Sequence, residues 1–224
     1  MPITTRVTTN GIAINADLYA PVAATTSSGL VILAYGTDGM SEPWGTQIRG
    51  YAEGLSQLGF ISMIPDYFAC TGTAVGQNVF QEMATQRDTW QHALADAVTY
   101  AEVNLGVDAG RVGLLGFSLG GHLCLRLRAA AKVLVEFFAP ELDGLGSSTG
   151  LTSHAQIHHG QADELVPFHP NADDIGQTLK NEGIAVDVFS YPGATHGFIG
   201  VDPNNANARM GSLHRTLSCF GTYL

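Results

Sequence analysis

Ser118 stands inside a glycine-rich segment, Gly116-Phe117-Ser118-Leu119-Gly120-Gly121. A Gly-x-Ser-x-Gly spacing between a strand and a helix is the pattern of a nucleophile elbow. The glycines remove side chains that would collide in so tight a turn, and the serine hydroxyl then stands clear of the backbone. The N–H of Leu119 would point to where an oxyanion forms. The segment therefore predicts acyl chemistry with Ser118 as the nucleophile.

A serine hydroxyl needs a base, and the base needs an acid to orient it. His196 lies in a loop shaped by a proline and two glycines, directly after the apolar segment Ile184–Ser190. Asp163 lies in the loop after the preceding predicted strand, and is preferred to Glu164 because adjacent side chains point apart. Serine, acid and histidine follow in this order along the chain of hydrolases built on an elbow. We therefore expect a triad of Ser118, Asp163 and His196.

The second oxyanion donor should come from the loop after the predicted strand Leu30–Ala34. Thr37 is the preferred backbone N–H donor there, with Asp38 as the alternative. Trp44 follows a few residues later, where a pocket wall and a packed core tryptophan are equally good interpretations. The residues expected to line the substrate pocket are Tyr35, Asp38, Trp44 and Phe198.

The elements that would position these residues alternate between strand and helix. Asn10-Gly11 separates Ile3–Thr9 from Ile12–Ala20, which predicts an N-terminal antiparallel hairpin. Further predicted strands are Leu30–Ala34, Phe60–Pro65, Arg111–Leu115, Val133–Phe138, Ala155–His159 and Ile184–Ser190. Predicted helices are Gly50–Leu58, Gln81–Asn104, Leu119–Ala131, Ala172–Asn181 and Asn205–Phe220. This alternation indicates an α/β fold with a mostly parallel sheet and helices on both faces.

The 224 residues contain no charge block, internal repeat or long linker, so we expect a single domain over residues 1–224. The connection between the predicted strands Val133–Phe138 and Ala155–His159 holds about sixteen residues. In hydrolases of this architecture a lid domain would be inserted at this point. Sixteen residues are too few for a large lid, so the site should be open.

The formal net charge of −10 argues against nucleic acid or an anionic membrane surface as a partner, because both require a basic footprint. No apolar run approaches the roughly 20 residues needed to span a bilayer. The first residues lack the apolar core of a secretory signal, which favours a cytoplasmic protein. A small-molecule ester or lactone is the expected partner. The oligomeric state is left open, a homodimer being one option.

Neither the cysteines nor the histidines indicate a metal or cofactor site. The widely spaced cysteines are expected to be buried free thiols: Cys70, Cys124 and Cys219. Neighbouring His158 and His159 should point to opposite faces of their strand, which prevents joint ligation. No metal-binding or dinucleotide motif is present, so no cofactor is expected. His122 and Asp66 are interpreted as a packed side chain and a loop anchor.

These segments together resemble the dienelactone hydrolase family of the α/β-hydrolase fold. The resemblance is carried by Pro65-Asp66-Tyr67, by the elbow from Gly116 to Gly121, by Gly160 to Pro167 and by Tyr191 to Phe198. They occur in the family's order along nearly the whole chain. The resemblance implies the hydrolase fold and the triad, and says little about the substrate.

Two differences separate the chain from dienelactone hydrolases themselves. Those enzymes have a cysteine nucleophile and a glutamate in the first loop, where this chain has Ser118 and Gly36. Their substrate carboxylate is bound partly by an arginine four residues after the triad histidine, a position held here by Gly200. Arg87 and Arg209 are the remaining candidates for such a contact. We therefore expect a serine esterase of the wider family.

The expected reaction is cleavage of a carboxylic ester or lactone through an acyl-enzyme. Acyl transfer to peroxide or an amine by the same triad is an alternative. A third interpretation is a protein that keeps the triad but serves as a small-molecule receptor or scaffold without catalysis.

Overall fold

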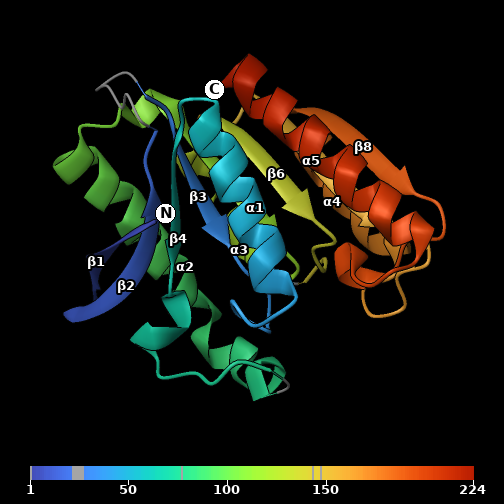
Figure 1. Cartoon of the computed structure of the whole chain (residues 1–224), viewed down its shortest axis with the longest axis horizontal. Helices are drawn as coiled ribbons and strands as arrows, with labels where there is room; N and C mark the ends of the chain where they lie inside the picture. The colour runs from blue at the N-terminus through green and yellow to red at the C-terminus, as the bar shows by residue number, and fades with distance from the viewer. Residues whose placement is uncertain (1, 22–27, 77, 143, 147) are drawn as a thin grey trace.

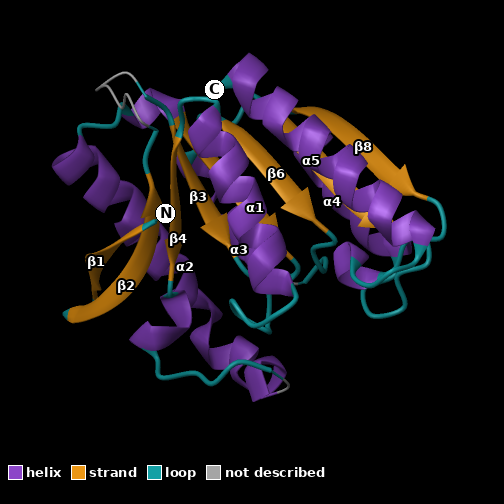
Figure 2. Ribbon diagram, viewed as in Figure 1, coloured by secondary structure: helices purple, strands orange, loops and turns teal. Residues whose placement is uncertain are grey.

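A single eight-stranded sheet forms the centre of the computed structural model, which describes residues 2–21, 28–76, 78–142, 144–146 and 148–224 (Figures 1 and 2). The strand order is β1-β2-β4-β3-β5-β6-β7-β8. The strands are β1 Ile3–Thr9, β2 Ile12–Tyr19, β3 Leu30–Ala34, β4 Ile61–Pro65, β5 Val112–Phe117, β6 Val133–Phe137, β7 His154–Gly160 and β8 Ala185–Tyr191.

The N-terminal hairpin forms as the sequence predicts. β1 and β2 pair antiparallel around Asn10 and Gly11, both of which have positive φ, as the turn requires. β2 then pairs antiparallel with β4, and the pairs from β4 through β8 are parallel. The strands from β3 to β7 are buried along their whole length, because helices cover both faces of a parallel sheet.

The helices form two layers around this sheet (Figure 1). α1 (Trp44–Gln57) and α5 (Pro203–Tyr223) lie side by side on one face, while α2 (Asn78–Leu105), α3 (Leu119–Leu127) and α4 (Phe168–Asn181) cover the other. Short 3₁₀ turns occupy Tyr67–Cys70, Ala109–Arg111, Arg128–Ala130 and His196–Phe198. The architecture is the α/β-hydrolase arrangement that the alternating pattern indicates.

Several boundaries differ from the predicted ones. α1 begins at Trp44 rather than at Gly50, with Pro43 at its N-cap. α4 spans Phe168–Asn181, but His169 has non-helical φ and ψ, so the continuous helix starts after this residue, close to the predicted Ala172. Prolines are tolerated in the first turn of a helix because the N–H that they lack has no intrahelical acceptor there. The helix predicted to end at Ala131 ends at Leu127 and continues as a 3₁₀ turn.

The connection from β6 to β7 contains no helix or strand in its described residues, so no lid domain is inserted there. Among the residues that the structure describes, no helix combines the length and apolarity needed to cross a membrane. The three cysteines are buried free thiols, as predicted.

Candidate active site

The elbow turn places Ser118 between β5 and α3 with φ 53° and ψ −118°, a conformation that L-residues rarely adopt. The turn is tight enough to need its glycines. A Cβ on Gly116 would lie 2.4 Å from the carbonyl oxygen of Gly120, and a Cβ on Gly120 would lie 2.1 Å from that of Ala34. The Ser118 N–H donates to the carbonyl of Phe137 on the neighbouring strand. The serine is thereby fixed to the carboxyl edge of the sheet.

Asp163 lies in the loop after β7, with 4% of its surface exposed. One carboxylate oxygen, Oδ1, accepts the N–H groups of Leu165 at 3.0 Å and Val166 at 2.8 Å. Burial alone would raise the pKa of this carboxyl, but hydrogen bonds from His159 and His196 outweigh it and hold the pKa well below its usual range. Asp163 is therefore an anion throughout the neutral range.

His196 lies between Ser118 and Asp163, within hydrogen-bond distance of both. Its Nδ1 lies 2.7 Å from Oδ2 of Asp163, and its Nε2 lies 3.2 Å from Oγ of Ser118. A carboxylate only accepts hydrogen bonds, so Nδ1 carries the proton and Nε2 presents its lone pair to the serine hydroxyl. The structure thus brings the three predicted residues together in one hydrogen-bonded chain from Ser118 through His196 to Asp163.

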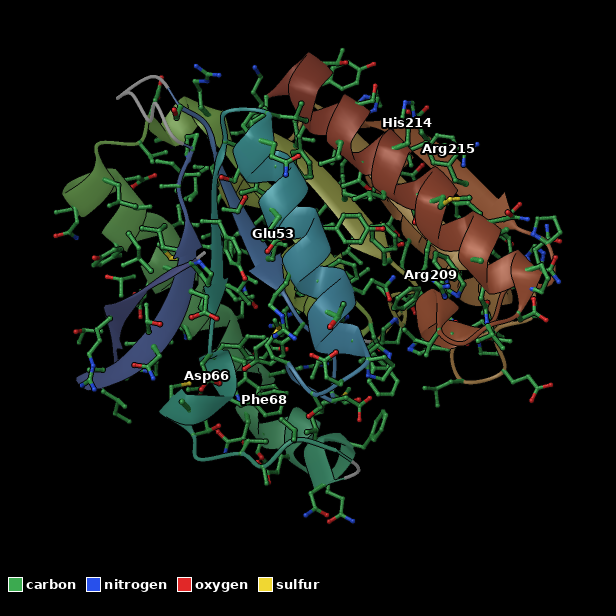
Figure 3. The ribbon with its side chains drawn as sticks, in the orientation of Figure 1. Glu53, Asp66, Phe68, Arg209, His214 and Arg215 are labelled. Atoms are coloured by element: carbon green, nitrogen blue, oxygen red, sulfur yellow. The ribbon has the colours of Figure 1, made fainter. Side chains whose placement is uncertain are left out.

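The loop that carries His196 is held by α5. Asn205, which is 4% exposed, accepts the N–H of Thr195 at 2.9 Å and donates to the carbonyl of Ile199 at 2.6 Å. Arg209 donates to the carbonyls of Phe198 and Gly200, and Figure 3 labels it on α5. Asn205 and Arg209 therefore hold the loop by hydrogen bonds to its backbone before and after His196.

A cavity of about 200 Å³ opens beside Ser118 and His196. Its walls are mostly apolar, and its lining residues are Gly36, Thr37, Asp38, Gly39, Trp44, Gln47, Ile48, Phe117, Ser118, Phe138, Leu165 and His196. The ring of Phe138 lies 4.7 Å from that of His196, centroid to centroid. Phe138 has φ 40°, so the chain leaves β6 in a strained conformation that turns this ring toward the histidine.

The two predicted oxyanion donors belong to α3 and to the loop after β3. Leu119 is the first residue of α3, where a backbone N–H has no intrahelical acceptor. Thr37 lines the cavity from the loop after β3, and a Cβ on the adjacent Gly36 would lie 3.2 Å from Cβ of Ser118. Asp38, the alternative donor, also lines the cavity.

The predicted pocket residues divide into two groups. Trp44 and Asp38 line the cavity, whereas Tyr35 and Phe198 lie outside it. Tyr35 is buried and donates its hydroxyl to Asp66 at 2.9 Å, which identifies Asp66 as a loop anchor. Phe198 is fully buried behind the wall, with its ring 5.3 Å from that of Phe138. Nearness in sequence to the loops of the site does not determine which way a ring turns.

Sequence reasoning missed several wall residues: Gln47, Ile48, Phe117, Phe138 and Leu165. Phe117 sits inside the elbow motif, so its position was available as a signal. Neither Arg87 nor Arg209 lines the cavity. Among the described residues, no group of three or more histidine, cysteine, aspartate or glutamate side chains could hold a metal ion. His122 is buried, and burial lowers its pKa to about 4.

Comparison with known proteins agrees with the fold described above. Residues 14–224 match the model of the dienelactone hydrolase family. A dienelactone hydrolase-like promiscuous phosphotriesterase from metagenomic libraries has a TM-score of 0.82 at 18% identity, with 100% of this chain and 98% of that chain covered. The esterase Est2 of Thermogutta terrifontis, in a propionate-bound form, has a TM-score of 0.72 at 20% identity, covering 96% and 92%. At these identities the solved structures support the fold.

A curated relative, the non-reducing polyketide synthase Preu6 of Preussia isomera, is 28% identical over 141 residues. The match takes in 58% of this chain and 6% of that protein, so the chain corresponds to a small part of the synthase.

Proposed function

The chain belongs to the dienelactone hydrolase family, and from the geometry of its site we propose that it is a serine hydrolase that cleaves a carboxylic ester or lactone through an acyl-enzyme. The observation that carries this proposal is the hydrogen-bonded chain from Ser118 through His196 to Asp163. A receptor or scaffold would not need the serine, imidazole and buried carboxylate to lie in hydrogen-bond contact.

In the proposed reaction, Oγ of Ser118 attacks the carbonyl carbon while Nε2 of His196 takes the hydroxyl proton. Asp163 holds the imidazole in the required tautomer and stabilises its positive form. The N–H groups of Leu119 and Thr37 donate to the oxyanion of the tetrahedral intermediate. His196 then gives its proton to the leaving alkoxide and activates a water molecule that releases the acyl group. No cofactor takes part in this scheme.

The cavity favours a small acyl or lactone group with a mainly apolar body, because its volume is about 200 Å³ and most of its walls are apolar. No lysine or arginine lies among its lining residues, and Asp38 adds a carboxylate. A substrate carboxylate would find no cationic partner among these residues. We therefore propose an uncharged short-chain ester or lactone rather than a carboxylate-bearing dienelactone.

The test is turnover of p-nitrophenyl acetate by Ser118→Ala, compared with the wild-type chain and with Ser41→Ala, which changes an exposed serine. We expect Ser118→Ala to lose essentially all turnover and labelling by a fluorophosphonate, while its melting temperature stays near that of the wild type. Full residual turnover in Ser118→Ala would refute the assignment. Product analysis with added hydrogen peroxide or an amine separates hydrolysis from acyl transfer.

A further inference from the structure

Gln47 lines the catalytic cavity and has no part in the proposed reaction. It lies in the first turn of α1, three residues after Trp44 and one before Ile48, and both of these also line the cavity. Side chains spaced by three and four residues lie on one face of a helix. This face of α1 therefore forms one wall of the cavity, and Gln47 supplies the amide of that wall.

The Nε2 atom of Gln47 is buried and has no hydrogen-bond partner among the described residues. Leaving a buried donor unpaired costs free energy of folding, so native proteins retain few such groups. The last torsion of a glutamine side chain has a broad, roughly two-fold profile, so the amide can turn at little cost. An acceptor oxygen of a substrate in the cavity would supply the partner that the protein does not.

The turn that carries Gln47 is fixed by other groups. The N–H of Thr46 donates to Oε2 of Glu42 at 3.2 Å, and Arg49 forms an ion pair with the same carboxylate. These contacts hold the start of α1 without using the Gln47 amide. The place of Gln47 in the wall is therefore set, while its N–H groups stay available to a ligand.

The other polar side chains of the cavity offer different chemistry. Ser118 and His196 act at the scissile bond in the proposed reaction. Asp38 has a carboxylate that only accepts hydrogen bonds, and the hydroxyl of Thr37 both donates and accepts. An amide nitrogen only donates. Nε2 of Gln47 is thus the group of this wall that an acceptor alone can satisfy.

Gln47 also borders a second hollow, of about 420 Å³, outside the catalytic cavity. The other residues that line this hollow are Glu42, Pro43, Thr46, Ile199, Gly200 and Arg209. Gln47 lines both spaces, whereas Ser118 lines the catalytic cavity and not the second hollow. The amide therefore lies at the boundary between them, where the part of an acyl group remote from the scissile carbonyl would reach.

We propose that Gln47 determines acyl specificity: its amide N–H₂ donates to a second oxygen of the acyl group, remote from the scissile ester. The preferred substrate is then an uncharged ester or lactone whose acyl part carries an ether, keto or hydroxyl oxygen. This inference rests on the proposed serine chemistry and specifies the substrate class of the same site.

The test uses pairs of p-nitrophenyl esters that differ by one ether oxygen in place of a methylene. The pairs are methoxyacetate with butyrate, and 3-methoxypropanoate with pentanoate. The oxygen also changes the intrinsic reactivity of the carbonyl, so the readout is the ratio of kcat/KM values within a pair, compared between each variant and the wild type. This comparison cancels the intrinsic difference between the two esters.

Gln47→Leu removes the donor at similar side-chain volume. We expect it to lower the ether-to-methylene ratio by about three- to tenfold in at least one pair, the effect of one lost hydrogen bond. Gln47→Glu keeps the shape but only accepts, so it should lower the ratio at least as much. Gln57→Leu, at the exposed end of the same helix, is the matched control and should leave both ratios unchanged. Unchanged ratios in Gln47→Leu for both pairs would overturn the inference.

A measurement without substrate separates this role from a structural one. Because Gln47→Leu replaces an unpaired donor with an apolar side chain, its melting temperature should equal or exceed that of the wild type. A fall of several degrees would show that the amide holds the fold together, and would also overturn the inference. Failure of the proposed function is visible separately, as turnover of p-nitrophenyl acetate that persists in Ser118→Ala.

Discussion

Oδ2 of Asp163 accepts the Nδ1–H of His196 at 2.7 Å, and the carboxylate is held on its other side by two backbone N–H groups. Asp163→Asn should reduce kcat/KM by about 10³- to 10⁴-fold, because an amide can donate to Nδ1 and so favour the wrong tautomer. Asp174→Asn, which changes an exposed aspartate of α4, is the control and should stay near wild-type activity. Steady-state kinetics on p-nitrophenyl acetate decide the matter, and near-normal rates for Asp163→Asn would contradict the assigned role.

Asn205 bonds the backbone on both sides of His196, so its loss should affect both stability and rate. Asn205→Ala leaves a backbone donor and an acceptor without their partner, and we expect a loss of about 2 kcal/mol in the free energy of unfolding. We also expect kcat to fall by at least tenfold as the histidine loop loosens. Urea denaturation and kinetics provide the two measurements. Asn207→Ala, on the exposed side of the same helix, should change neither.

Phe138 limits the cavity beside His196, so Phe138→Ala should widen it. We expect the variant to lose rate on acetate esters, because the imidazole loses its packing partner, and to gain relative preference for butyrate and hexanoate esters. A graded series of p-nitrophenyl esters measures this as a ratio of kcat/KM values. Leu151→Ala removes an exposed apolar side chain as the control. An unchanged ratio would mean that Phe138 does not set acyl size.

Glu136 gives the stability of the fold a dependence on pH. Its folded-state pKa of about 7 lies above the ordinary value of 4.5, so the native state holds a proton that the unfolded state releases. Its contribution is therefore fully present below about pH 4.5 and is lost as the pH rises to about 7.

Glu136→Gln has no carboxyl group to titrate, so its free energy of unfolding should not fall over this pH range. Relative to the wild type, its free energy of unfolding should rise by on the order of 2 kcal/mol between pH 5 and 8. Urea unfolding at several pH values tests it. Glu53→Gln on α1, labelled in Figure 3, changes an exposed carboxyl and should follow the wild-type curve. Parallel curves for Glu136→Gln and the wild type would contradict the buried titration.

The convergence of Ser118, Asp163 and His196 could be predicted because their spacing along the chain follows from the order of the strands. Glycines mark the elbow, and the acid and the base follow apolar segments that have few alternatives to being strands. The opposite orientations of His158 and His159 likewise follow from the two-residue period of a strand. The hydrogen-bond partners of these histidines could not be predicted, because His159 lies near Asp163 only through the conformation of the loop between them.

The cavity wall was harder to predict for the same reason. Phe138 reaches His196 only through a backbone conformation with positive φ, which no propensity indicates for a phenylalanine. Leu165 lines the cavity although much of it is exposed, so neither burial nor periodicity marks it. Tyr35 does not line the cavity beside Ser118, and its hydroxyl donates to Asp66. Local patterns determine elements well, whereas loop side chains depend on neighbours that are distant along the chain.

The three proposed catalytic side chains follow β5, β7 and β8, and β6 separates β5 from the other two strands in the sheet. During refolding, the nucleophile and its base cannot meet until the C-terminal half of the sheet has paired and α5 has docked. Recovery of enzymatic turnover would then trail the recovery of helical circular dichroism, which makes the reaction itself a kinetic reporter of the last assembly step.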